Sequence, residues 1–154
     1  MGTLTSFMQQ ALAQAERAFS AGEVPVGAIV TRAGKVIARA GNKIVAPFDP
    51  TGHAEIRVLR QACARLKTTH LTDCDLYVTL EPCPMCAQAI AWAQVRRLYF
   101  GAYDPKSGGV EHGPRIFTHA SCHHQPEVVG GCEEALCRAV LVRFFSSKRA
   151  TGLP

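Results

Sequence analysis

The chain has 154 residues, of which 47% are hydrophobic and 19% are charged, which fits a single domain over residues 1–154 and excludes a largely disordered protein. No apolar run approaches membrane-spanning length and no signal peptide is indicated, so we expect no membrane association and a cytoplasmic location. The formal net charge of +5 is compatible with a nucleic-acid partner, although many small enzymes reach this charge without one.

The first third of the chain predicts a helix followed by a β-hairpin. Apolar residues recur at helical spacing over residues 5–21, with Thr5 or Ser6 as the candidate N-cap. Two β-branched runs, residues 24–30 and 36–40, flank a short turn that contains a glycine. This pattern is typical of two antiparallel strands joined by a tight turn.

A second helix is predicted over residues 54–66, where apolar residues again recur at helical spacing. His53 and Glu55 fall in its first turn, and Asp49 or Thr51 is the candidate cap. The start of this helix therefore carries an imidazole and a carboxylate two residues apart.

The segment from Leu76 to Cys86 predicts a buried strand that is followed directly by the start of a helix. Residues 76–80 are apolar or β-branched, and Pro82 cannot continue a central strand. Pro84 suits a first helical turn, where its missing amide costs nothing. Cys83 and Cys86 therefore lie at or near a helix N-terminus, which favours their thiolate forms.

The remaining elements complete a sheet covered by helices. The helix after Pro82 is expected to bury Met85 and Trp92, and a strand follows over residues 95–100. A long polar connection then leads to a short strand at residues 127–129, and a connection of that length implies that these two strands are parallel. With a last helix from Cys132 to Phe145, the order of elements describes an α/β fold, a three-layer α/β/α sandwich with a mixed five-stranded sheet.

Three side chains have the types that bind a catalytic zinc ion. His53, Cys83 and Cys86 offer one imidazole and two thiolates, which leaves the fourth position of a tetrahedral ion open for water. Because two thiolates weaken the metal as a Lewis acid, a base is needed nearby, and Glu55 is placed to take the proton of that water. Seven cysteines in a chain without an export signal argue against a disulfide scaffold.

The combination of His53-Ala54-Glu55 with Pro82-Cys83-Pro84-Met85-Cys86 resembles the signature of the zinc-dependent nucleoside and nucleobase deaminases. Further segments resemble the bacterial tRNA-specific adenosine deaminases over most of the chain, namely Glu23-Val24-Pro25-Val26-Gly27-Ala28, Gly41-Asn42, Leu76-Tyr77-Val78-Thr79-Leu80-Glu81, Gly101-Ala102-Tyr103-Asp104-Pro105-Lys106 and Phe144-Phe145. This resemblance implies a cytidine deaminase-like fold, one Zn²⁺ per chain and a homodimer.

The resemblance also implies a reaction, a partner and the residues that serve them. The substrate would be the wobble adenosine of a tRNA anticodon stem-loop, deaminated to inosine by a zinc-activated water with Glu55 as the proton shuttle. Asn42 would contact the flipped nucleotide, and the backbone N–H of Ala54 would meet the purine edge. The other RNA contacts that it implies are Asp104, Lys106, Phe144 and Phe145.

Three other functions are compatible with parts of the same pattern. A small-molecule deaminase acting on guanine, cytosine or a free nucleoside would use the same zinc site. A thiol oxidoreductase would use Cys83 and Cys86 as a redox pair, but it would leave His53 and Glu55 without a role. A structural zinc module that binds RNA would need no catalytic carboxylate.

Overall fold

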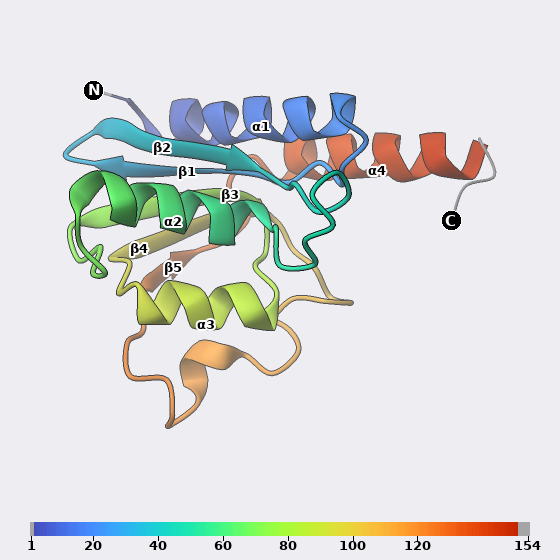
Figure 1. The fold of residues 1–154 in the computed structure, drawn as a ribbon. Helices are drawn as coiled ribbons and strands as arrows, with labels where there is room; N and C mark the ends of the chain where they lie inside the picture. Colours follow the sequence, from blue (N-terminus) through green and yellow to red (C-terminus); the bar gives the residue numbers. More distant parts are fainter. Residues whose placement is uncertain (1, 151–154) are drawn as a thin grey trace.

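The computed structural model describes residues 2–150, which form one mixed sheet with a pair of helices on each face (Figure 1). Helices α1 (Leu4–Ser20) and α4 (Glu134–Ala150) cover one face, while α2 (Ala54–Leu66) and α3 (Pro84–Trp92) cover the other. The predicted three-layer α/β/α sandwich is therefore confirmed.

The sheet has five strands in the order β2-β1-β3-β4-β5. Their bounds are β1 Gly27–Arg32, β2 Lys35–Gly41, β3 Cys74–Leu80, β4 Arg97–Ala102 and β5 Glu127–Val129. Strand β1 is antiparallel to both β2 and β3, whereas β3, β4 and β5 are mutually parallel. The parallel pairing predicted for the last two strands is confirmed, and their long connection contains one 3₁₀ turn, η1 (Ile116–Thr118).

The β1–β2 hairpin closes through a two-residue turn. Ala33 and Gly34 have φ angles of 51° and 76°, and two consecutive left-handed residues match the twist of an antiparallel hairpin. Strand β1 begins at Gly27 rather than at residue 24, because Pro25 has no backbone N–H for the ladder. The Gly27 N–H instead donates to the hydroxyl of Thr79 on β3, at 3.1 Å.

The predicted N-cap residues of α1 and α2 are both wrong. Helix α1 is capped by Thr3, which exchanges hydrogen bonds with Ser6 in a capping box. At the start of α2, Asp49 accepts hydrogen bonds from the backbone and hydroxyl of Thr51 at 2.9 and 2.7 Å, so these two side chains satisfy each other. The N-cap position of α2 is His53, whose side chain makes no capping bond.

Two residues of α3 that were expected in the core lie on the surface. Met85 is 38% exposed and Trp92 is 68% exposed, because the face of α3 that meets the rest of the protein carries smaller side chains. Those buried side chains are Cys86, Ala87, Ile90 and Ala91. No helix among residues 2–150 is long and apolar enough to cross a membrane.

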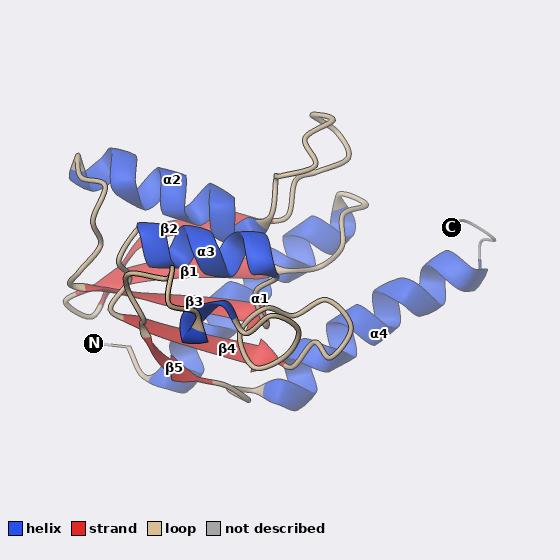
Figure 2. Cartoon of the chain, turned by 90° about the horizontal axis from the view of Figure 1, so that it is seen from below, coloured by secondary structure: helices blue, strands red, loops and turns tan. Residues whose placement is uncertain are grey.

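The functional end of the molecule is where β2, β3 and β4 finish. Figure 2 shows α2 and α3 side by side over the sheet, with long loops at one end of both helices and α4 extending past the strands on the same side. Strands β2 and β3 run in the same direction, because both are antiparallel to β1, and β4 is parallel to β3. The loops that follow these three strands therefore all start at this end. Side chains from the starts of α2 and α3 are thereby brought together.

Candidate metal centre

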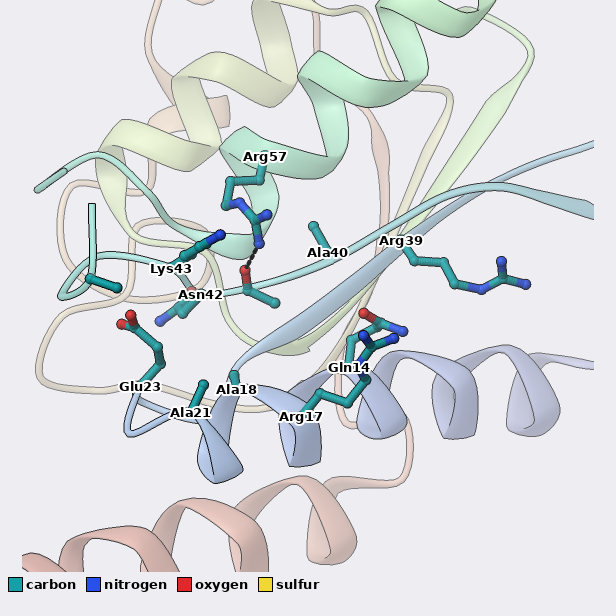
Figure 3. A pocket seen from close by; sticks show the side chains of 12 residues that line it. Gln14, Arg17, Ala18, Ala21, Glu23, Arg39, Ala40, Asn42, Lys43 and Arg57 are labelled. Carbon is teal, nitrogen blue, oxygen red and sulfur yellow. Dashed lines mark hydrogen bonds between the residues drawn. The ribbon is translucent and has the colours of Figure 1, made fainter. Parts of the chain in front are cut away.

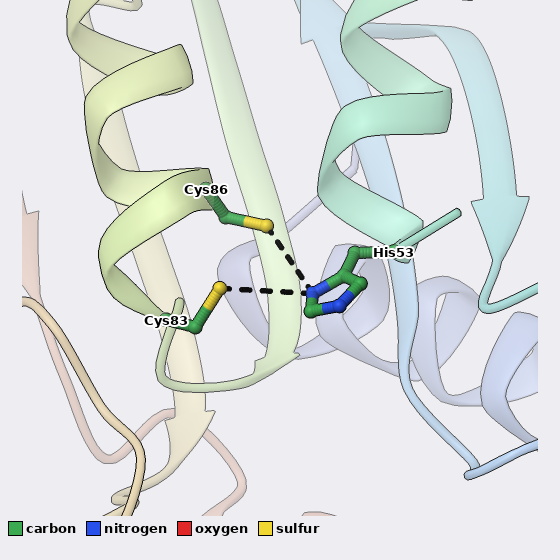
Figure 4. A group of neighbouring side chains, drawn as sticks. All are labelled: His53, Cys83 and Cys86. Atoms are coloured by element: carbon green, nitrogen blue, oxygen red, sulfur yellow. Dashed lines mark hydrogen bonds between the residues drawn. The ribbon is translucent and has the colours of Figure 1, made fainter. Parts of the chain in front are cut away.

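The starts of two helices bring an imidazole and two sulfurs together (Figure 4). His53 is the N-cap of α2, Cys83 is the N-cap of α3 with Pro84 after it, and Cys86 lies one turn further along α3. The His53 Nδ1 lies 3.7 Å from the Cys83 Sγ and 3.5 Å from the Cys86 Sγ. Among residues 2–150, these three form the one group of His, Cys, Asp and Glu side chains close enough to hold a metal ion.

The spacing of these atoms fits a tetrahedral zinc ion. Bond lengths of about 2.0–2.1 Å to nitrogen and about 2.3 Å to sulfur, at tetrahedral angles, require roughly 3.6 Å between an imidazole nitrogen and a thiolate sulfur. The observed distances of 3.5 and 3.7 Å agree with that requirement, and all three ligand atoms lie within 4.8 Å of one another. The side chains therefore need little rearrangement to bind such an ion, and they leave one coordination position free of protein ligands.

The pKa values of the two thiols are shifted in opposite directions. A hydrogen bond from Cys86, together with His53, lowers the pKa of Cys83 to about 4, although burial opposes this. The same bond to Cys83, with burial, raises the pKa of Cys86 far above its ordinary value. The hydrogen bond to Cys83 likewise raises the pKa of His53. The three groups thus share protons that a divalent cation would displace.

Glu55 lies next to this cluster in the first turn of α2 and is only 4% exposed. Burial, with a smaller contribution from the Cys83 thiolate, raises the pKa of Glu55 to about 7 against the opposing effects of a backbone hydrogen bond, His53 and a bond to Cys86. A carboxyl group with a pKa near 7 both accepts and donates a proton readily at neutral pH. Within residues 2–150, Glu55 forms no ion pair with an Arg, Lys or His side chain.

Asn42 ties the end of β2 to the start of α2. Its Oδ1 accepts a hydrogen bond from the backbone N–H of Ala54 at 2.8 Å, and Asn42 is 9% exposed. The Ala54 N–H, expected from the family resemblance to face the purine, is therefore engaged by Asn42 in this structure. This bond supplies the capping interaction that the helix lacks at His53, and it holds His53 in place.

The loop after β4 carries Asp104 and Lys106 at the same end of the molecule. The Asp104 Oδ1 accepts hydrogen bonds from the N–H groups of Lys106 and Ser107 at 3.2 and 3.0 Å, so this carboxylate shapes its own turn. The Lys106 side chain is exposed. Asp104 and Lys106 thus lie together in one turn, as adjacent charges of opposite sign.

Glu81 anchors that loop, a role that the sequence did not reveal. It is 2% exposed, and its Oε1 accepts from the Asp104 N–H at 3.0 Å and lies 2.8 Å from the His112 Nδ1. Its Oε2 accepts from the N–H groups of Val110, Glu111 and His112, at 2.9–3.2 Å. Burial alone would raise the pKa of Glu81, but these hydrogen bonds together lower it. The sequence signal that could have indicated this role is a charged residue placed between a buried strand and Pro82, because a buried charge needs hydrogen-bond partners.

A groove beside α4 contains Phe144 and Phe145, the aromatic pair predicted to contact RNA. Phe144 is 5% exposed and packs edge-on against Phe19 with ring centres 5.4 Å apart, whereas Phe145 is 44% exposed. Both line a cavity of about 350 Å³ together with Lys148 and Arg149. Of the two phenylalanines, only Phe145 thus presents a large ring surface to solvent.

Comparisons with known proteins all point to deaminases. The family model of MafB19-like deaminases matches residues 4–143. The chain is 50% identical to the tRNA-specific adenosine deaminase of Agrobacterium fabrum (strain C58 / ATCC 33970) over 149 residues, which cover 97% of this chain and 98% of that protein.

Solved structures give the same result. A structure from a study of A-to-I editing by tRNA:A34 deaminases superposes with a TM-score of 0.87 and 50% identity, covering 89% of this chain and 99% of that one. A guanine deaminase from Nitrosomonas europaea superposes with a TM-score of 0.83, covering 95% of this chain and 86% of that one. At 23% identity, this second similarity shows the shared fold alone.

Proposed function

The chain belongs to the family of tRNA-specific adenosine deaminases, and we propose that it hydrolyses the wobble adenosine of a tRNA anticodon stem-loop to inosine. The observation that carries this proposal is the buried Glu55 beside the cluster of His53, Cys83 and Cys86. That arrangement combines a three-ligand metal site with a carboxylate that is not needed as a ligand.

The metal that fits this donor set is zinc, one ion per chain. Two sulfurs and an imidazole are ligands that zinc prefers, and the nitrogen–sulfur distances of 3.5 and 3.7 Å suit its tetrahedral geometry. When bound, zinc supplies an activated water as the nucleophile. His53, Cys83 and Cys86 contribute by holding that position open toward Glu55.

Glu55 moves the protons of the reaction. It accepts a proton from the water that adds to C6 of adenine and delivers it to N1; it then transfers the second proton to the exocyclic amine. The C6–N bond breaks, ammonia leaves and the carbonyl of inosine forms, so the reaction consumes one water and needs no oxidant. A pKa of about 7 suits a group that must accept and donate in turn.

Asn42 and the residues around it provide the contacts to the flipped nucleotide. The Asn42 Oδ1 accepts from the Ala54 N–H, and the Asn42 NH₂ group, which makes no hydrogen bond within residues 2–150, would reach the ribose or base. On the other side, the exposed ring of Phe145 would stack on a base, and Lys106 would meet a phosphate. Glu81 fixes the loop on which Asp104 and Lys106 stand.

We further propose that the protein works as a homodimer in the cytoplasm, where tRNA is available. Helix α3 exposes Met85 and Trp92, and Trp92 lines a largely apolar cavity of about 570 Å³ together with Leu59 and Cys63 of α2. A large exposed tryptophan over an apolar hollow is typical of a protein interface. Pairing two copies through this face would bury Trp92.

The test is turnover with defined substrates. The zinc-loaded protein is incubated with an anticodon stem-loop RNA that carries adenosine at the wobble position, with the same RNA carrying guanosine there, and with free guanine, cytosine and cytidine. We expect inosine and one equivalent of ammonia from the adenosine RNA alone. Ammonia from free guanine and none from the RNA would instead assign the protein to the small-molecule deaminases.

A further inference from the structure

A basic groove runs along the free edge of the sheet, next to the metal centre (Figure 3). It is a cavity of about 390 Å³ between the second half of α1, the end of β2 and the first turn of α2. Each of these segments, and the loop after β2, contributes a cation. The four cations are Arg17, Arg39, Lys43 and Arg57.

The positive charge of this groove is not neutralised. Within residues 2–150, none of its four cations takes part in an ion pair, whereas Arg32, Arg96 and Arg97 elsewhere on the protein are each paired with a carboxylate. The one acidic residue that lines the groove, Glu23, is 3% exposed. Both of its oxygens accept hydrogen bonds from backbone N–H groups of the loop after β2, so this carboxylate is committed to the fold.

The groove is connected to the reaction centre at one end. Asn42 lines the groove and also holds the Ala54 N–H, one residue from His53. In the same region, Glu23 lines both this groove and the one that contains Phe145. The exposed ring of Phe145 in one groove and the uncompensated cations of the other thus lie on either side of Glu23.

We propose that the RNA strand on one side of the flipped nucleotide lies in this groove, with its phosphates bound by Arg17, Arg39 and Lys43. This inference rests on the proposed function and adds the path of the RNA backbone. Alternation of stacking surfaces with a positively charged groove is how proteins bind single-stranded nucleic acid, and an acidic protein partner would not need the aromatic part.

Arg57 has a supporting role in this arrangement. Its guanidinium donates to the backbone carbonyl of Gly41, so it is half-buried and held in position (Figure 3). Arg17 and Arg39 are exposed and make no side-chain hydrogen bond or ion pair within residues 2–150. Removing them therefore changes the charge of the groove without removing an internal contact.

The experiment compares two double variants of the zinc-loaded protein that lose the same charge. Arg17→Gln/Arg39→Gln removes two cations from the groove. Lys35→Gln/Lys67→Gln removes two exposed cations from the opposite end, at the hairpin turn and at the C-cap of α2. The Kd for the adenosine stem-loop RNA is measured from 0.05 to 0.5 M KCl, and deamination is followed on the same RNA.

We expect the groove variant to lower the slope of log Kd against log salt by roughly 1.4, at about 0.7 for each contact to a single-stranded phosphate. This corresponds to a Kd about 25-fold higher at 0.1 M KCl, with the two Kd values becoming equal toward 1 M KCl, and to a raised KM. The control variant should match the unmodified protein in Kd, slope and turnover.

Three results would overturn the inference. Equal Kd and slope for both double variants, with normal deamination by the unmodified protein, would show that RNA does not bind in this groove and would leave the proposed function intact. Unchanged RNA affinity together with lost binding of polyglutamate would assign the groove to an acidic protein. If the unmodified protein deaminated no adenosine RNA, the proposed function itself would fail, and this inference with it.

Discussion

Replacing Glu81 by glutamine should destabilise the protein by about 3 kcal/mol. The carboxylate accepts five hydrogen bonds while 2% exposed, and such charge-assisted bonds are each stronger than neutral ones by roughly 0.5–1 kcal/mol. In Glu81→Gln, the amide oxygen can face the three N–H donors of residues 110–112, which costs about 2 kcal/mol in weaker bonds. The amide nitrogen then faces the Asp104 N–H, which loses its acceptor at a cost of about 1–2 kcal/mol.

Urea unfolding followed by circular dichroism measures this loss, on protein with equal zinc content. A loss of about 3 kcal/mol corresponds to a fall in Tm of roughly 6–12 °C for a chain of this length. The matched control is Glu127→Gln, since Glu127 is paired with Arg97 at 3.0 Å but its side chain is 65% exposed, and such pairs contribute about 0–1 kcal/mol.

The pH dependence of the same variant tests whether the charge is responsible. The pKa of Glu81 is lowered in the folded protein from the ordinary value of 4.5, so the ionised form stabilises the fold above pH 4.5. That contribution is lost as the pH falls through the folded pKa, and the difference between Glu81→Gln and the unmodified protein should shrink there. A variant as stable as the Glu127→Gln control, or a difference that does not shrink as the pH falls from 7 to well below 4.5, would refute the anchoring role.

Three further outcomes are expected. Glu55→Gln should retain zinc and the fold but lose at least about 100-fold in deamination rate, because the proton shuttle is removed; a zinc assay and single-turnover kinetics check this, and a smaller loss would exclude Glu55 as the shuttle. Cys86→Ser should lose zinc and unfold at lower temperature, whereas Cys63→Ser, outside the cluster, should retain both; zinc bound by Cys86→Ser at full occupancy would contradict the ligand assignment. Trp92→Glu should convert a dimer to a monomer in analytical ultracentrifugation, while Leu136→Glu on α4 should not, and a dimeric Trp92→Glu would exclude the α2–α3 face as the interface.

Local patterns in the sequence were sufficient to predict the layers of the fold and to propose the chemistry. Alternation and helical spacing depend on the nearest neighbours in the chain, so the order of helices and strands, and with it the α/β/α sandwich, followed from them. The length of the connection before residues 127–129 also decided that β4 and β5 are parallel. His53, Cys83 and Cys86 were predicted as a group because few other functions combine these residue types at two helix starts.

Side chains that act across the fold could not be read from neighbours in the chain. Asn42, not Asp49 or Thr51, completes the start of α2, because the end of β2 lies against that helix only in the folded protein. Trp92 has the spacing of a core residue but lies on the outer face of α3, and whether a second copy covers that face is not encoded in the periodicity.

The sequence alone therefore predicted the candidate metal ligands and the candidate general base, since these are properties of residue type and short spacing. The tertiary structure alone decided how the loops around that chemistry are held. Glu81 accepts bonds from residues 23–31 positions further along the chain, and Arg17 and Arg39 reach one groove from a helix and a strand. Such contacts depend on where the sheet brings distant segments together, and no local pattern specifies that.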